Sequence, residues 1–307
     1  MLGYAVSPKG PSVSVRHLRL SKLPVANPHY PRSARICAVI VYSKVVVIQM
    51  RIKWYGTASL LIEGGNTRIL IDPYLRQFNK KLPPVPVEEA TSAEAIFITH
   101  PHFDHFSDVA AFIRGNVKTV YVSENGINIA RKNGFFSEAM TPLGADEEIT
   151  VGDITVRTYL SRHCKFDTAT VLGIAFNPLT YFHISHAVAL LKGMKRYKTT
   201  CDIYALEISC EGKKVMVLGS AGMDGDTSYP QGADLLVFPY QGRTRMHKYS
   251  IPFLQTFSPK AVMIDHFDNA FPPFTHNVNT KKFVPTVNGE FPAIKAFVPS
   301  ENEWYEI

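Results

Sequence analysis

The chain has 307 residues, of which 46% are hydrophobic, 19% charged and 11% aromatic. This composition is that of a folded globular protein and excludes a fibrous repeat or a wholly disordered chain. The net charge of +7 is concentrated at the start, because residues 1–50 hold seven Lys and Arg side chains and no acidic one. Residues 51–307 carry 26 basic and 26 acidic side chains, and this balance argues against a nucleic-acid binding protein.

The first 49 residues also differ from the rest of the chain in pattern. They contain five prolines and show no helical or alternating periodicity before Ile36. We predict that residues 1–49 are a basic, Pro-rich extension, either disordered or the product of an upstream over-reading of the gene, and that the folded domain covers 50–307. The alternative is a membrane-surface or targeting arm, which the basic charge would suit.

The apolar run at residues 36–50 and the cysteines bear on the compartment. The run is interrupted by a serine and a lysine, is shorter than the about 20 residues of a spanning helix, and lacks a small-residue cleavage site. We therefore expect no membrane span. The four cysteines (Cys37, Cys164, Cys201 and Cys210) form no CxxC pair and are too few to cross-link a fold of this size. A reducing, cytoplasmic location is the expectation.

From Arg51 onward the apolar pattern predicts strands in quick succession, followed by alternating strands and helices. Three short strands are predicted at 51–56, 58–63 and 67–72, with a turn at Gly64-Gly65-Asn66 between the last two. Next come a buried strand at 93–99, a helix at 107–114, a strand at 118–123 and a helix at 124–134 that Gly134 ends. This order is typical of the α/β class.

Strands dominate again in the second half. We predict two strands within 149–160, a helical insert at about 178–200, a hairpin of 202–209 with 213–219, a strand at 233–239, a helix at 249–257 and a last core strand at 261–266. Nothing marks a linker between residues 51 and 307. We therefore expect this span to be one domain.

The residues that carry chemistry are concentrated in THPHFDHFSD, directly after the buried strand at 93–99. In an extended segment His100 and His102 project to the same side, so both imidazoles reach one metal ion. The turn that follows directs Asp104 and His105 toward a second position. Zn²⁺ suits these nitrogen and oxygen donors. The alternative is a surface loop that happens to be rich in histidine.

This HxHxDH pattern after a hydrophobic strand resembles the signature of the metallo-β-lactamase superfamily. The segment IKWYGTASLLIEGGNTRILIDPYL is similar to the opening strands of its UPF0173 and ascorbate-6-phosphate lactonase-like branch of metal-dependent hydrolases. The resemblance runs from Arg51 to the C-terminus, apart from the helical insert. It implies an αβ/βα four-layer sandwich, with two mixed β-sheets, helices outside and metal ions at one edge between the sheets.

The resemblance also implies two metal sites. The first would consist of His100, His102 and His163, and the second of Asp104, His105 and His266. It further implies that Asp72, in an Asp-Pro pair at the end of an early strand, orients a ligand histidine from outside the metal's own shell.

The sequence departs from the superfamily at the ligand that bridges the two metals. That ligand is usually an aspartate, and KKVMVLGSAG places Ser220 there. A neutral hydroxyl offsets the repulsion between two cations about 4 Å apart poorly. Asp224 is the candidate to replace the carboxylate, although with Asp226 it lies in a Gly-rich loop where aspartates form turns. The first metal site is therefore the firmer expectation, and Ser220 stays a doubtful ligand.

The expected function is that of a metal-dependent hydrolase in which one or two Zn²⁺ ions, or Mn²⁺ or Fe²⁺, activate a water molecule. Asp104 would orient that water or act as general base, and His266 would stabilise the transition state. The substrate class is a small ester, lactone or phosphoester. Two alternatives stay open: a degenerate member that binds metal or ligand without efficient turnover because of Ser220, and a nuclease, which the balanced charge disfavours.

Several residues bear on the substrate without deciding it. Arg162 and Lys165 flank His163 and offer a place for an anionic group, as does a second basic cluster in QGRTRMHKY (Arg243, Arg245, His247 and Lys248). A solvated loop is the alternative for both. His183 and His186 share a face of the insert, where an ordinary half-buried helix is the simpler interpretation than a lid. The insert is also a candidate surface for pairing of subunits.

Overall fold

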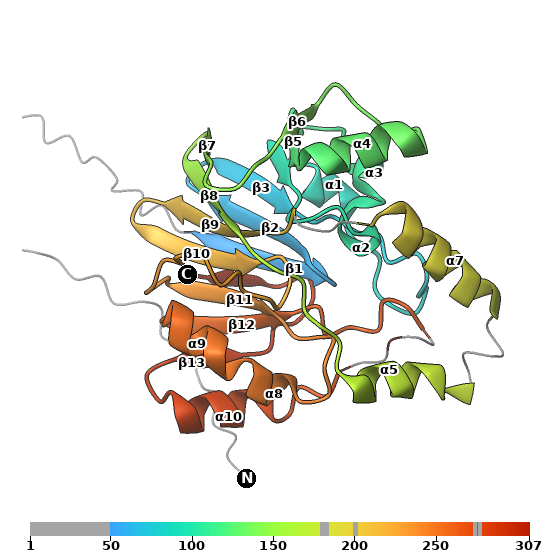
Figure 1. Ribbon diagram of the computed structural model, residues 1–307. Helices are drawn as coiled ribbons and strands as arrows, with labels where there is room; N and C mark the ends of the chain where they lie inside the picture. Colours follow the sequence, from blue (N-terminus) through green and yellow to red (C-terminus); the bar gives the residue numbers. More distant parts are fainter. Residues whose placement is uncertain (1–49, 179–183, 199–201, 273–274, 276–277) are drawn as a thin grey trace, which may run out of the picture. The chain divides into compact units, whose positions relative to one another are not determined.

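The computed structural model describes residues 50–178, 184–198, 202–272, 275 and 278–307 (Figure 1). The predicted extension at 1–49, His183 and part of each end of the predicted insert lie outside these residues. The described residues from Met50 to Ile307 form one compact unit. No helix among the described residues is both long enough and apolar enough to cross a membrane.

The described strands form two seven-stranded sheets. Sheet one contains β1 (Arg51–Gly56), β2 (Ser59–Gly64), β3 (Thr67–Ile71), β4 (Ala95–Phe97), β5 (Thr119–Val122), β6 (Met140–Pro142) and β14 (Trp304–Glu306), in the order β14-β1-β2-β3-β4-β5-β6. Sheet two contains β7 (Glu148–Val151), β8 (Ile154–Leu160), β9 (Tyr204–Cys210), β10 (Lys213–Leu218), β11 (Leu235–Pro239), β12 (Ala261–Asp265) and β13 (Lys295–Phe297), in the order β13-β12-β11-β10-β9-β8-β7.

Both sheets are mixed. In sheet one, β3 to β6 pair parallel with one another, whereas β14, β1, β2 and β3 pair antiparallel with one another. In sheet two, β10 to β13 are parallel and β7 to β10 antiparallel. Because β8 and β10 are both antiparallel to β9, the strands β8, β10, β11 and β12 all end at one edge of sheet two.

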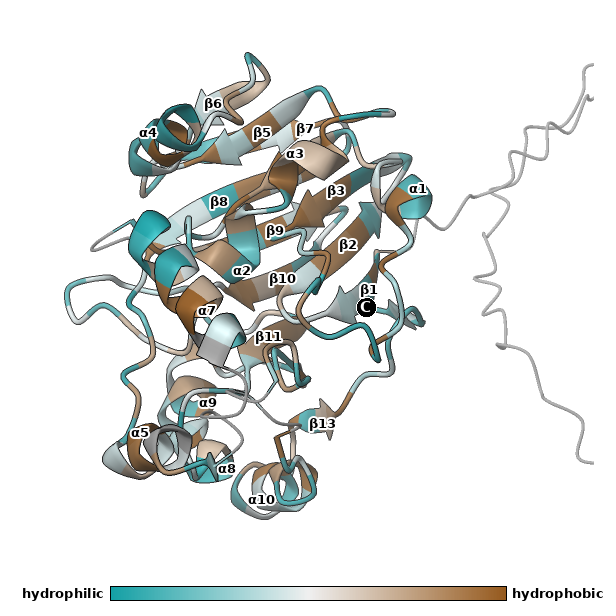
Figure 2. Ribbon diagram, turned by 90° about the vertical axis from the view of Figure 1, so that its right-hand side faces the viewer, coloured by the Kyte–Doolittle hydropathy of each residue, from teal (hydrophilic) through white to brown (hydrophobic). Residues whose placement is uncertain are grey.

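Helices cover the outer face of each sheet (Figure 1). On sheet one these are α1 (Val87–Ala90), α2 (Phe103–Phe106), α3 (Val109–Phe112) and α4 (Glu124–Asn133). On sheet two they are α8 (Met246–Tyr249), α9 (Ile251–Phe257) and α10 (Phe283–Glu290). Two further helices, α5 (Thr168–Ala175) and α7 (Ile184–Arg196), lie at one end of both sheets (Figures 1 and 2).

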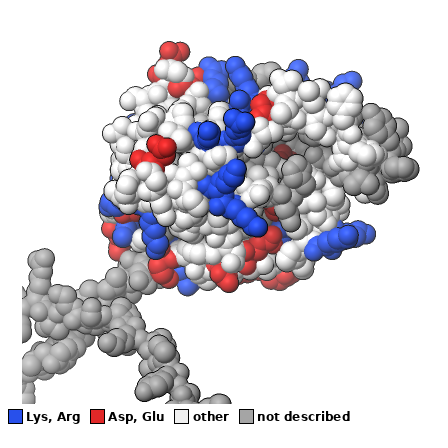
Figure 3. All heavy atoms as spheres, turned by 90° about the horizontal axis from the view of Figure 1, so that it is seen from below, with Lys and Arg blue, Asp and Glu red and all other residues white. Residues whose placement is uncertain are grey.

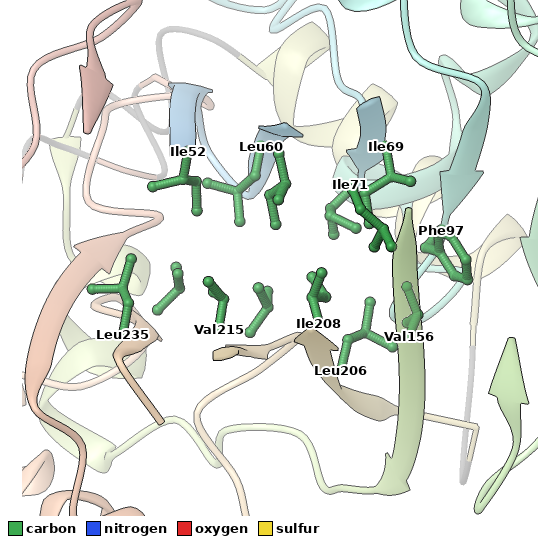
Figure 4. Close-up of a cluster of buried hydrophobic side chains, with 14 of the residues drawn as sticks. Ile52, Leu60, Ile69, Ile71, Phe97, Val156, Leu206, Ile208, Val215 and Leu235 are labelled. Carbon is green, nitrogen blue, oxygen red and sulfur yellow. The ribbon is translucent and has the colours of Figure 1, made fainter. Parts of the chain in front are cut away.

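The main core lies between the two sheets, where aliphatic side chains of one face those of the other (Figure 4). Ile52, Leu60 and Ile69 come from sheet one, and Leu206 and Val215 from sheet two. All of these side chains are fully buried because each strand turns one set of alternate residues inward. Burial of this apolar surface is what holds the two sheets together.

The structure confirms the predicted fold, two mixed sheets with helices outside. The predicted helix at 124–134 is also present, with Ser123 accepting a hydrogen bond from the amide of Gly126 at its start and Gly134 in the left-handed region at its end. Several elements were not foreseen, among them α1, β6, α10 and β13. Also unforeseen are α5, an apolar helix that precedes the predicted insert, and β14, a three-residue strand that pairs with β1.

We predict that Leu206→Ala lowers the free energy of unfolding by about 3–5 kcal/mol, because a cavity in the close-packed layer between the sheets relaxes only partly. The matched control is Leu191→Ala on α7, where the side chain is 65% exposed and the expected change is within about 0.5 kcal/mol. Urea unfolding followed by circular dichroism measures both. Equal effects of the two substitutions would contradict the assignment of the core.

Candidate metal centre

The ends of five strands bring polar residues to one edge between the sheets. Asp72 directly follows β3, and His100 lies three residues after β4. From sheet two, His163 follows β8, Gln241 follows β11 and His266 directly follows β12. Because these strands end at matching edges of the two sheets, side chains far apart in sequence meet there.

A tight turn distributes the ligands of the HxHxDH segment. His102 has an extended backbone and precedes the first residue of α2, so the chain changes direction between His102 and Asp104. Asp104 lies in the first turn of α2 and His105 in its last, and successive helical residues point in different directions. The segment therefore presents side chains to two neighbouring positions.

The structure brings six side chains into two groups of three. The ligand atoms within each group lie within 4.8 Å of one another, and the groups are His100, His102 and His163, and Asp104, His105 and His266. In the first group His100 Nε2 lies 3.1 Å from His102 Nδ1. In the second, His266 Nε2 lies 3.1 Å from Asp104 Oδ2. The two groups adjoin, since the rings of His100 and His105 have centroids 4.0 Å apart.

Asp72 orients two of these histidines, His105 directly and His100 through Thr99. Its Oδ1 accepts a hydrogen bond from the Thr99 amide at 2.8 Å, and its Oδ2 accepts one from the Thr99 hydroxyl. His105 Nδ1 donates to the same Oδ2 at 2.8 Å. Because the Thr99 hydroxyl proton is directed to Asp72, its oxygen accepts from His100 Nδ1 at 3.1 Å. Both His100 and His105 therefore keep an Nε2 lone pair for a metal ion.

The histidines from sheet two are oriented in the same way. His163 Nδ1 donates to the carbonyl oxygen of Cys164 at 2.8 Å. His266 Nδ1 donates to Gln241 Oε1 at 2.8 Å, which leaves its Nε2 facing Asp104. Four of the five ligand histidines thus have Nδ1 paired with an acceptor and Nε2 directed into the site. Histidines that bind metals in proteins are held in this manner.

The electrostatics of the first group also fit a cation. Burial lowers the pKa of His102 to about 4. Burial, with the charges of the neighbouring histidines, holds the pKa of His100 well below its usual range, and burial also lowers the pKa of His163. All three imidazoles are consequently neutral at physiological pH, and neutral imidazole is the form that binds a metal.

The second group is an acid and two histidines whose charges stabilise one another. Burial alone would raise the pKa of Asp104, but the charges of His105 and His266 outweigh it and the pKa is lowered. Burial would likewise lower the pKa of His266, yet the hydrogen bond and the charge of Asp104 raise it to about 9. The three-nitrogen first group and the mixed second group are both donor sets that first-row transition metals such as zinc prefer.

Three of the eight described non-glycine residues with a left-handed backbone lie at the same edge. Asp72, Thr57 and His266 have φ angles of 44°, 49° and 54°, in the left-handed region that non-glycine residues rarely adopt. Each is held there by the surrounding structure; for example, the His266 amide donates to the Thr57 carbonyl at 2.8 Å. Such conformations cost about 1–3 kcal/mol each and cluster at functional sites.

Ser220 and Asp224 are engaged elsewhere in the structure. The Ser220 hydroxyl accepts a hydrogen bond from the Cys164 amide at 3.0 Å and so fixes the loop that carries His163. The Asp224 carboxylate belongs to neither ligand group and pairs with Arg162 at 2.5 Å. The structure therefore does not bring Asp224 to the position of the bridging carboxylate. Arg162, which the sequence offered as an anion contact, is neutralised by the same pair.

Three residues at this edge were not predicted from the sequence to belong to the site. Thr99 and Gln241 hold ligand histidines, and Asp265 lies buried beside His266 with its Oδ1 unpaired. Burial raises the pKa of Asp265 to about 7. All three lie at or just after the end of a buried strand, which is the one sequence signal that could have identified them.

Comparison with known proteins places the chain in a family. The family model of the beta-lactamase superfamily domain matches residues 67–254. The chain belongs to the beta-lactamase superfamily. This membership confirms the resemblance seen in the HxHxDH segment and in the opening strands.

Relatives and solved structures agree with this membership. The chain is 25% identical to a UPF0173 metal-dependent hydrolase of Ligilactobacillus salivarius over 75% of this chain and 90% of that one. It is 31% identical to a UPF0173 protein of Pyrococcus abyssi over 37% of this chain, and there the match spans only half of the relative's length. The fold is that of Igni18, a metallo hydrolase from Ignicoccus hospitalis, with a TM-score of 0.55 and 14% identity over 84% of this chain and 98% of that one.

We predict that Asp72→Asn weakens metal binding by about 10–100-fold, because an amide nitrogen cannot accept the hydrogen bonds of Thr99 and His105 that orient the imidazoles. Competition with a chromophoric chelator for Zn²⁺ measures the affinity. The matched control is Asp153→Asn, an exposed aspartate that accepts from the Asn66 amide in a distant turn and should leave the affinity unchanged. An affinity of the Asp72 variant equal to that of the wild type would exclude this orienting role.

Proposed function

We propose that the protein is a metal-dependent hydrolase that cleaves a small ester, lactone or phosphoester. The observation that carries the proposal is the pair of adjoining ligand groups at the meeting edge of the two sheets; within each group the ligand atoms lie within 4.8 Å of one another. The names of the UPF0173 relatives as metal-dependent hydrolases support the same reaction class.

We assign the first metal ion to His100, His102 and His163 and the second to Asp104, His105 and His266. A bound divalent metal ion supplies Lewis acidity and lowers the pKa of water from 15.7 toward about 7. Zinc fits both donor sets, and Mn²⁺ and Fe²⁺ fit the second, more oxygen-rich set as well. A reducing, cytoplasmic compartment stays a prediction from the sparse cysteines.

Asp104 and His266 are the side chains of this site that can act on the substrate and the water. Asp104 is partly exposed at the rim, where its carboxylate can orient a water molecule and accept its proton during attack. When only the first metal site is filled, His266 Nε2 is not a ligand and lies 3.1 Å from Asp104, while Nδ1 is held by Gln241; a proton on Nε2 can then be donated in a hydrogen bond to charge that develops on the substrate. Asp104 is thus proposed as the general base and His266 as the group that stabilises charge in the transition state.

Ser220 makes the second metal site the weaker one. With a hydroxyl engaged by Cys164 in place of a carboxylate, Asp104 is the one carboxylate in the two ligand groups of the described residues, so the repulsion between two cations is offset less completely. We therefore predict that dialysis against a graded chelator removes one metal equivalent well before the other, and that Ser220→Asp raises the retention of the more weakly held equivalent. Unchanged stoichiometry in Ser220→Asp would show that this position does not face the second metal.

The reaction class is tested with panels of chromogenic esters, lactones and phosphodiesters in the presence of Zn²⁺, Mn²⁺ or Fe²⁺. We expect metal-dependent turnover, and we expect His102→Ala to lower kcat/KM by more than the about 100-fold that loss of an outer partner causes. His186→Ala is the matched control, because His186 is an exposed histidine on α7 outside both ligand groups. Its kcat/KM should equal that of the wild type.

Two other outcomes decide between the proposal and its alternative. If the wild-type protein binds metal but turns over no member of the panels, it is a non-hydrolytic member of the superfamily. If hydrolysis survives His102→Ala with the fold intact, the reaction does not use the first metal site.

A further inference from the structure

The exposed large hydrophobic side chains of the described residues are confined to one short part of the chain. They all lie between residues 166 and 194, on and beside α5 and α7: Phe166, Val171, Leu172, Phe176, Val188, Leu191 and Met194. Their exposed fractions range from 43% to 76%. The two helices lie at the same end of the sheets in both ribbon views (Figures 1 and 2). A gathering of this kind marks an interaction surface.

The helix α5 is apolar yet has no described side chain that is buried. Its sequence, TATVLGIA, contains no charged residue, and Val171 and Leu172 are 50% and 48% exposed. A helix that is hydrophobic all round normally lies inside a protein or a membrane. Nothing else in the described chain covers α5, so its apolar surface is available to a partner.

The helix α7 uses one face for the domain and leaves the other outside. Leu190 and Tyr197 pack toward Phe103, and a Cβ on Gly193 would lie 3.1 Å from the Phe103 ring, so this face rests closely on α2. The remaining surface of the helix exposes Leu191 and Met194 together with the lysines and arginine of the same helix. Helices that lie in a membrane interface combine exposed apolar residues with basic ones on the polar face.

Cations outnumber acids in this region. Residues 166–201 include four Lys and Arg side chains and one acidic residue, Asp167, whose carboxylate accepts hydrogen bonds from the amides of Thr170 and Thr244. Beside α5, a pocket of about 640 Å³ is bounded by Ala169 of α5, by Arg245, His247 and Lys248 at α8, and by Lys282 before α10. No ion pair within the described residues engages Arg245, Lys248 or Lys282, and Figure 3 shows Lys and Arg gathered in a band on the face that carries α8 and α10.

We propose that α5 and α7 dock the protein on the surface of an anionic phospholipid membrane. In this arrangement the exposed side chains of Leu172, Phe176 and Leu191 enter the boundary of the acyl chains. The basic pocket beside α5 then receives the phosphate of a lipid headgroup through Lys248 and Lys282.

Charge complementarity selects the membrane over a second copy of the chain. Two such faces brought together would oppose an excess of like charges, since the four Lys and Arg side chains of residues 166–201 and the cations of the pocket outnumber Asp167. An anionic bilayer buries the exposed apolar side chains of the helices and pairs the cations with lipid phosphates. The docking face is also linked to the metal centre, because α7 rests on Phe103, which lies between His102 and Asp104.

Vesicle binding of the full-length chain tests the proposal. Co-sedimentation is measured with vesicles of phosphatidylglycerol and phosphatidylcholine and with vesicles of phosphatidylcholine alone. We expect binding to the mixed vesicles at least tenfold stronger, and weaker binding as salt increases. Because residues 1–49 carry basic side chains of their own, variants of the docking face decide the outcome.

Two double variants separate the charge and the apolar contributions. Lys248→Gln with Lys282→Gln should weaken binding to anionic vesicles about 30-fold, since each cation near such a surface contributes about fivefold. Leu172→Ser with Phe176→Ser should weaken it at least about tenfold. The matched control is Lys118→Gln with Lys132→Gln, two exposed lysines at β5 and α4 that should leave binding unchanged. Melting temperatures close to that of the wild type show that the variants are folded.

Three results would overturn the proposal. Equal weakening by the control pair would show that only net charge matters, and full binding by the Leu172 and Phe176 variant would show that α5 does not insert. A wild-type dimer in sedimentation velocity that this same variant converts to a monomer would assign the apolar face to a second copy instead.

Discussion

The Asp72 carboxylate is the interaction on which the rest of the site depends. It is a buried charge at the end of β3, and it accepts hydrogen bonds from the Thr99 amide, the Thr99 hydroxyl and His105 Nδ1. A buried carboxylate is stable only when its lone pairs are satisfied in this way. By meeting that requirement, Asp72 connects β3, β4 and α2 and sets the orientation of one histidine in each ligand group.

The parallel arrangement of β3 with β4 and of β10 with β11 and β12 is what makes this edge available. Parallel strands release their carboxyl ends on the same side, so loops from both sheets meet over the core without long connections. The apolar layer between the sheets keeps those ends in register. The core of the sandwich therefore affects the site by fixing the positions of the strand ends, and the strand ends carry the ligand residues.

The sequence was informative where a feature is local and less so where it depends on distant pairing. The segment from His100 to His105 could be interpreted directly, because four polar residues follow one buried strand within six positions. His163 and His266 could be proposed from the order of strand ends in a familiar superfamily, and the structure brings both to the ligand groups. The pairing of Gln241 with His266 depends on which strands become neighbours, and no local pattern contains that information.

The structure bears on two features that the sequence left open or did not address. Asp224 accepts a hydrogen bond from the Asp226 amide and pairs with Arg162, distant in sequence, so it forms the turn that its Gly-rich loop suggested and does not replace a bridging carboxylate. An apolar segment such as α5 is ordinarily predicted to be buried, yet here it is exposed beside cations. The periodicity of a sequence predicts that a helix forms. It does not show whether the apolar residues of that helix are buried within the same molecule or against a partner.

The most direct measurement is the metal content per chain, by elemental mass analysis after mild dialysis, of the wild type, His102→Ala and His266→Ala. We predict two equivalents in the wild type and the loss of one, a different one, in each variant, since the two histidines belong to separate ligand groups. Absence of bound metal from the wild type, or two equivalents retained in both variants, would contradict the assignment of the metal centre.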